Sequence, residues 1–147
     1  MKELSILLCF ISSLSFAQLP NKPTLADVRS YNQGNMLKVE IGNTKNQVLE
    51  EMGGVQIIQT WSPRNPNTWA KPKSITISNP YSRDLKLSKD STTVEVLWYY
   101  TDIKNYDNAI NKEELTPIII AKNSVIGLGW GFYTDYAKKQ EIMIDMR

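Results

Sequence analysis

The sequence predicts an α+β domain in which one or two N-terminal helices pack on an antiparallel sheet of about three to five strands. Several short stretches in the second half of the chain alternate apolar and polar residues with a period of two, which is typical of strands. The stretch 44–53 instead has both a helix start and a helix stop signal. Short turn sequences separate the strand-like stretches, so we expect neighbouring strands to pair antiparallel.

Residues 1–17 have the layout of a secretory signal peptide. Lys2 precedes the apolar run Leu4–Ile11, and Ser15-Phe16-Ala17 ends with small residues at the −3 and −1 positions. We therefore expect cleavage after Ala17 and export to the periplasm or beyond the cell. The apolar run is shorter than the roughly 18 residues that span a bilayer. Cys9 follows two leucines inside this run, so the sequence predicts no lipid anchor and no stable membrane anchor.

Composition excludes several classes of function. The chain has no histidine, a single cysteine and a formal net charge of +2. After cleavage the mature chain would contain neither histidine nor cysteine, because Cys9 lies in the leader. This excludes His- or Cys-based metal centres and most nucleophile–base pairs. A weak basic balance in an exported protein argues against nucleic acid as a partner. Roughly 130 mature residues suit one domain with its own core.

Two helices are expected before the sheet. Residues 18–35 form a polar leader, in which a short helix from about Leu25 to Tyr31 follows a possible cap at Thr24. The single domain is expected over 36–147, and Met36–Ile41 alternates as an extended segment would. The helix Thr44–Met52 has the strongest signals, because Thr44 and Gln47 fit a capping box and Gly53-Gly54 fits a left-handed stop.

The next segments predict strands around a proline-rich loop. Val55–Trp61 is rich in β-branched residues, Ser62–Lys73 contains three prolines, and Ser74–Ser78 is a short strand candidate. Trp61 and Trp69 in this region could form an aromatic patch that binds a ligand or partner, or could cover an edge of the core.

A hairpin is predicted after the turn at Asn79-Pro80-Tyr81. Asp84–Leu87 can pair with Thr92–Thr101 across Lys89-Asp90-Ser91. The second of these strands places Val94, Val96, Trp98 and Tyr100 on one face, as a central strand would.

The segment Asp102–Glu114 is rich in carboxylates and amides, which can bind calcium. The spacing fails for calcium, because Lys104 and Tyr106 occupy ligand positions and no glycine stands at the sixth. We therefore predict a solvated loop without a metal. No apolar pocket is signalled around these carboxylates, so we expect no catalytic acid or base.

The densest apolar run, Thr116–Tyr133, predicts a second hairpin. Thr116–Ala121 is joined by Lys122-Asn123-Ser124 to an expected strand, Val125–Tyr133. From Ile126, large residues alternate with three glycines, so a strand would have one bulky face and one bare face. The bare face could receive a helix, loop or ring of the same chain, receive a partner, or mark extra twist or a bulge.

The candidate partner-binding residues are therefore the three glycines and the two loop tryptophans: Gly127, Gly129, Gly131, Trp61 and Trp69. The glycine spacing does not fit a phosphate-binding loop, and we predict no catalytic residue, no metal ligand and no cofactor. A last helix is expected at Thr134–Ile142, capped by Thr134. The expected sheet combines Val55–Trp61, Thr92–Thr101, Thr116–Ala121 and Val125–Tyr133, with Thr44–Met52 packed across it.

Several segments together resemble a known family. Residues Leu37–Gly53 resemble the helix signature of the BamE (SmpA/OmlA) type domain. Later segments resemble a related group of exported bacterial proteins: Asn79-Pro80-Tyr81, Val94–Thr101, Glu114-Leu115-Thr116-Pro117 and Gly127-Leu128-Gly129-Trp130. The resemblance covers about Leu37 to Tyr133.

This resemblance implies a small α+β domain in the envelope of Gram-negative bacteria. Members bind proteins or act as accessories in outer-membrane assembly, and the domain is not an enzyme. The chain departs from the pattern because Asn43 stands where Met is usual, no proline follows Gly53, and the lipid-anchoring cysteine is missing. The last difference favours a soluble periplasmic or secreted relative.

The leading hypothesis is a non-catalytic envelope protein that acts through protein–protein contact, as an outer-membrane assembly accessory or a relative of one. A structural or inhibitory domain of β-lactamase-inhibitor-like shape fits the same layout. A different class of function is a periplasmic ligand-binding module or hydrolase that uses the Trp61–Trp69 loop with Asp102 or Glu113. The sequence predicts a protein partner without naming it, and it does not predict an oligomeric state.

Overall fold

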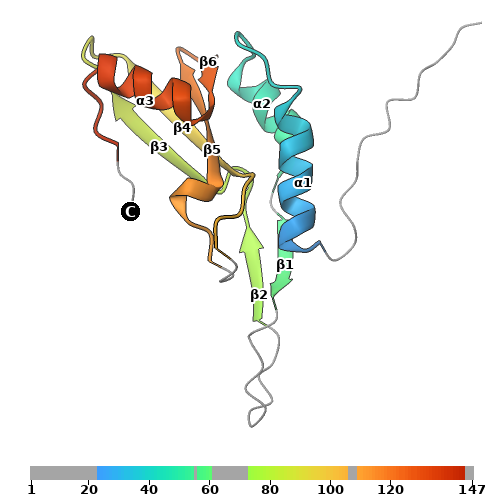
Figure 1. The fold of residues 1–147 in the computed structure, drawn as a ribbon. Helices are drawn as coiled ribbons and strands as arrows, with labels where there is room; N and C mark the ends of the chain where they lie inside the picture. The colour runs from blue at the N-terminus through green and yellow to red at the C-terminus, as the bar shows by residue number, and fades with distance from the viewer. Residues whose placement is uncertain (1–22, 55, 61–72, 106–108, 145–147) are drawn as a thin grey trace, which may run out of the picture.

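The protein is an α+β fold with an N-terminal helix packed on an antiparallel sheet (Figure 1). The computed structural model describes residues 23–54, 56–60, 73–105 and 109–144. Within these ranges, the larger sheet has the strand order β3-β4-β5-β6, and every neighbouring pair is antiparallel. Its strands are β3 (Ser82–Leu87), β4 (Thr93–Tyr100), β5 (Leu115–Ala121) and β6 (Ser124–Leu128).

The remaining elements are two short strands and the helices. The strands β1 (Gln56–Thr60) and β2 (Lys73–Ile77) pair in a separate two-stranded sheet, which extends away from the larger one in Figure 1. The helices are α1 (Leu25–Met36), α2 (Lys45–Met52) and α3 (Gly129–Lys139), with a short 3₁₀ turn, η1, at Lys112–Glu114. Among the described residues, no helix has the length and apolar character needed to cross a membrane.

Apolar side chains pack on both faces of the larger sheet, because alternate residues of the central strand β4 point to opposite sides. On one side, Trp98 packs with Val28 of α1 and Tyr133 of α3. On the other side, Tyr99 packs with Val48 and with other apolar residues of and around α2. The alternation predicted for Thr92–Thr101 is therefore confirmed, and it separates two apolar clusters.

The first helix is longer than the sequence indicated. Thr24 and Asp27 form a capping box, and the helix continues to Met36. The extended segment predicted at Met36–Ile41 is wrong, because turns follow α1: the Lys38 N–H donates to the Asn35 carbonyl at 3.0 Å. The alternating apolar residues there do not share a buried face, since Val39 is buried and Ile41 is exposed.

A pair of buried amides ties α1 to the rest of the fold. Asn32 and Asn79 each donate to the side-chain oxygen of the other, at 3.2 and 2.6 Å. Asn32 also donates to the Tyr100 carbonyl and Asn79 to the Met52 carbonyl, both at 2.8 Å. These bonds join α1, the end of α2, the turn before β3 and the end of β4. Buried amides with partners avoid the cost of unmet hydrogen bonds.

The second helix is confirmed with its predicted signals. Thr44 and Gln47 form the capping box, and Gly53 ends the helix with a φ of +68°. An added Cβ at Gly53 would lie 2.6 Å from the Tyr31 hydroxyl oxygen, so a side chain here would also require the Tyr31 side chain to shift. The helix packs Val48 and Met52 on the sheet, as expected.

Both predicted hairpins are confirmed, in β3–β4 and β5–β6. Lys122 and Asn123 have φ values of +50° and +64°, as the two central residues of a type I′ turn require. The expected sheet is corrected in one respect. The predicted strand Val55–Trp61 overlaps β1, which pairs with β2 outside the larger sheet, and β3 supplies the fourth strand there.

The predicted strand Val125–Tyr133 is wrong beyond Leu128. Gly129 has a φ of +81° and turns the chain from β6 into α3. Trp130 and Tyr133 then lie three residues apart on one face of α3, and both rings contact Trp98, with centroids 5.1 and 5.3 Å away. The three aromatic rings hold α3 against the sheet.

The predicted last helix, Thr134–Ile142, is wrong in its start, its cap and its end. α3 begins at Gly129 and ends at Lys139, so Thr134 lies inside it. The Thr134 hydroxyl donates to the carbonyls of Trp130 and Gly131, at 2.9 and 3.0 Å, as an interior helical threonine does.

Candidate functional site

The three candidate glycines do not share a face. Gly127 lies on β6 directly under the Phe132 ring, where an added Cβ would come within 2.2 Å of the ring. Gly129 is the positive-φ residue of the strand-to-helix turn, and Gly131 lies exposed on α3. The close approach at Gly127 is thus made by a ring of the same chain. Trp61 and Trp69, with the loop between them, lie outside the described residues.

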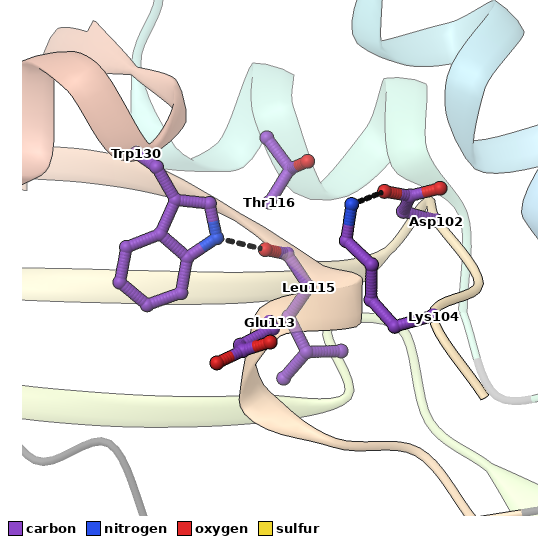
Figure 2. Close-up of a pocket in the computed structure, with 6 residues that line it drawn as sticks. All are labelled: Asp102, Lys104, Glu113, Leu115, Thr116 and Trp130. Carbon is purple, nitrogen blue, oxygen red and sulfur yellow. Dashed lines mark hydrogen bonds and ion pairs between the residues drawn. The ribbon is translucent and has the colours of Figure 1, made fainter.

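A pocket of about 280 Å³ opens where β4 ends and β5 begins (Figure 2). Trp130 forms one side, and its indole Nε1–H donates to the Leu115 carbonyl at 2.7 Å. The other lining residues are Asp102, Lys104, Glu113, Leu115 and Thr116. The pocket therefore brings together Asp102 and Glu113, the two carboxylates that the hydrolase hypothesis named.

The charges at this pocket are solvated and partly paired. The Lys104 ammonium lies 2.7 Å from an Asp102 carboxylate oxygen, and about half of each side chain is exposed. The Lys104 hydrogen bond, with a bond from the Ile103 N–H, lowers the pKa of Asp102. Asp102 is therefore ionised at neutral pH and is poorly suited to act as a general acid.

Glu114 is the buried carboxylate of this region, and it holds the loop in place. Its side chain accepts hydrogen bonds from the backbone N–H groups of Lys104, Asn105 and Asn111, at 2.7, 3.2 and 2.9 Å. Burial is the largest single influence and raises the pKa of Glu114, but the three donors together outweigh it and leave the pKa below its ordinary value. Glu114 is thus a structural anion that fixes the backbone at Lys104, Asn105 and Asn111.

The chemistry available at the pocket is limited. An indole, one ammonium group and two exposed carboxylates suit a small polar molecule or a polar side chain. Across the described ranges, no group of three or more His, Cys, Asp or Glu residues is placed to hold a metal ion.

A second surface feature lies on β3, at the edge of the sheet. Arg83, Leu85 and Leu87, which we call the β3 strip, stand opposite Leu97, Glu95 and Thr93 of β4, on the face that α2 covers. The ammonium of Lys45, the first residue of α2, pairs with Glu95 at 2.7 Å.

The covering by α2 does not extend over β3. Leu85 and Leu87 are 71 % and 65 % exposed. Within the described part of the chain, no strand pairs with the outer edge of β3.

Sequence reasoning missed the β3 strip. The alternation of Ser82–Leu87 shows that the leucines share a face. It does not show whether a helix covers that face, because this depends on where α2 packs. The available signal was the short length of the predicted strand Asp84–Leu87, which is common for edge strands.

Comparisons of this chain with protein-family models, with curated proteins and with solved structures find no match.

Proposed function

We propose that this protein is a non-catalytic cell-envelope protein that acts through protein–protein contact, and that the β3 strip is the contact surface. The observation that carries the proposal is the pair of exposed leucines beside an open strand edge. Exposed apolar side chains next to unpaired backbone groups favour the addition of a strand from another molecule.

The non-catalytic part of the proposal is supported by the state of the acidic groups. A general acid at neutral pH needs a raised pKa. The pKa values of Asp102 and Glu114 are instead lowered, by hydrogen bonds that favour the ionised form. Glu113 is an exposed side chain at the pocket rim.

The envelope location is proposed from the sequence. Residues 1–17, which lie outside the described residues, have the layout of a signal peptide cut after Ala17. The resemblance of Leu37–Gly53 to the BamE type domain is in keeping with the same compartment and with protein binding. The helix that this stretch contains, α2, lies on the face of the sheet next to the β3 strip.

Affinity capture tests the contact surface. A C-terminally tagged full-length chain is produced in its own cells, cross-linked and purified, as the wild type and as Leu85→Lys/Leu87→Lys. Leu37→Lys is the matched control, because Leu37 is 87 % exposed and lies between α1 and α2. We expect the wild type and the control to capture the same protein and the double variant to lose it. Equal capture by all three would refute the assignment of this surface.

A further inference from the structure

We propose that the partner at the β3 strip is a second copy of this chain, paired edge to edge through β3. The two larger sheets would then form one continuous antiparallel sheet. This inference rests on the proposed function and names its partner.

The hairpin determines which backbone groups face outward. In an antiparallel pair, residues that bond the neighbouring strand alternate with residues whose N–H and C=O point away from it. The Ser88 N–H donates to the Thr92 carbonyl at 3.0 Å, and the β3–β4 register continues from this pair. Every second residue before Ser88 therefore also bonds β4, and these residues are Lys86, Asp84 and Ser82. The N–H and C=O groups of Arg83, Leu85 and Leu87 therefore face the open edge.

Two copies related by a two-fold axis perpendicular to the sheet would pair β3 antiparallel with β3. Hydrogen bonds form when outward residues stand opposite outward residues, and axes centred on Asp84, Leu85 or Lys86 pair at least two of the three outward residues of each copy. An axis at Asp84 places two aspartates opposite each other, and an axis at Lys86 places two lysines opposite each other. An axis at Leu85 places Asp84 opposite Lys86 of the other copy, twice. Opposite charges stabilise a cross-strand pair and like charges destabilise it, so the Leu85 axis is favoured.

With the axis at Leu85, all three outward residues of β3 in each copy are paired. Leu85 faces Leu85 of the other copy, and Leu87 faces Arg83, whose aliphatic stem can cover it. Each of these outward pairs would exchange two backbone hydrogen bonds. The leucines of the β3 strip, which are exposed in the single chain, would then contact side chains of the other copy and lose part of their exposure.

The neighbours of β3 leave this arrangement possible. The Oδ2 atom of Asp84 accepts two hydrogen bonds, from Trp98 Nε1 at 2.8 Å and from Lys112 Nζ at 3.1 Å. The second carboxylate oxygen can accept a bond from Lys86 of the other copy. After α3, the chain passes the hairpin tip, where the Gln140 carbonyl accepts the Lys89 N–H, and Ile144 packs on the α3 side of the sheet. The β3 strip lies on the opposite, α2 side.

Disulfide trapping tests the register. Leu85→Cys is made with Cys9→Ser, so that the introduced thiol is the only one in the full chain. At the proposed axis the two Cα atoms would be about 5.5 Å apart, which is within the range that a disulfide bridges. We expect Leu85→Cys to form a covalent dimer under mild oxidation. Leu87→Cys and Arg83→Cys should stay monomeric alone and cross-link when mixed, because each faces the other.

Sedimentation tests the association without a cross-link. We expect the wild type to pass from monomer to dimer between about 10 µM and about 1 mM, as small interfaces do. Lys86→Glu converts two attractive pairs into two repulsive ones, so its dissociation constant should rise about tenfold. Lys122→Glu, with the same charge change at the far hairpin, is the control and should behave as the wild type. Circular dichroism checks that each variant is folded.

Two results would overturn this inference. One is a wild type that stays monomeric throughout this range, and the other is self-cross-linking of Leu87→Cys to the same extent as Leu85→Cys. If the chain is monomeric but still captures a different protein through the β3 strip, the second-copy inference fails and the proposed function stands. If capture does not depend on the β3 strip, the proposed function itself fails.

Discussion

Replacing Glu114 by Gln should strongly destabilise the protein. The carboxylate is 1 % exposed and accepts three backbone hydrogen bonds from Lys104, Asn105 and Asn111. A Gln side chain offers one acceptor oxygen, and its amide nitrogen would face at least one backbone N–H. Hydrogen bonds to a charged group contribute about 1.5–3 kcal/mol each, and an unmet buried donor costs about 1–3 kcal/mol. We therefore expect the free energy of unfolding to fall by about 2–4 kcal/mol at pH 7.

The stabilisation by Glu114 should depend on pH and should decrease in acid. Because the folded protein holds the pKa of Glu114 below its ordinary value of 4.5, the ionised carboxylate favours the folded state. That stabilisation is complete above the unfolded-state pKa and is lost as the pH falls through the lower folded-state pKa. The free energy of unfolding of the wild type should thus exceed that of Glu114→Gln by a constant amount near neutral pH, and this difference should become smaller below pH 4.5.

Urea unfolding followed by tryptophan fluorescence, repeated across pH, measures this difference. Glu113→Gln is the matched control, because Glu113 is the exposed neighbour, and it should change stability by less than about 0.5 kcal/mol. If Glu114→Gln is as stable as this control, or if its deficit grows as the pH falls, the structural role assigned to the buried carboxylate is wrong.

Gly127→Ala should lower the free energy of unfolding by about 1–2 kcal/mol, because the new methyl meets the Phe132 ring, and Phe132→Ala should remove most of this penalty in a double-mutant cycle. Thr44→Ala should cost about 1 kcal/mol through the lost helix cap, as measured by thermal unfolding. Gly131→Ala, exposed in α3, should stabilise the protein by about 0.5–1 kcal/mol, and a lower melting temperature would contradict this. Mass spectrometry of the native protein should find Gln18 at its N-terminus, whereas an uncut leader would refute export.

The parts of the fold that were predictable from sequence are those with local signals. The capping box of Thr44 and Gln47 and the stop at Gly53 place α2, since both depend on a few neighbouring residues. The same holds for the turn at Lys122-Asn123-Ser124, which needs residues that tolerate a positive φ.

The change from β6 to α3 could not be predicted in this way. Ile126, Leu128 and Trp130 continue the alternation of a strand, while Trp130 and Tyr133 begin the spacing of a helix. The two patterns overlap in a few residues. The helix is selected because the rings of Trp130 and Tyr133 contact Trp98, which is distant in sequence. Tertiary packing therefore determined where the strand ended.

The surface features were also beyond the sequence, for a related reason. The pocket depends on Trp130 reaching the Leu115 carbonyl from a helix that the sequence predicted as a strand. The β3 strip is exposed because α2 packs over β4 to β6 and leaves β3 uncovered. Each feature is a relation between elements, and the order of residues along one element does not contain it.

Amide hydrogen exchange of β3 tests most directly whether its open edge is a contact surface. In dilute protein, the amides of Arg83, Leu85 and Leu87 should exchange rapidly, whereas those of Asp84 and Lys86, bonded to β4, should be slow. Raising the concentration through the dimer range should protect the first three amides by at least about tenfold and leave the other two nearly unchanged. Rapid exchange of Leu85 at every concentration would contradict the pairing of two copies of this chain through the edge.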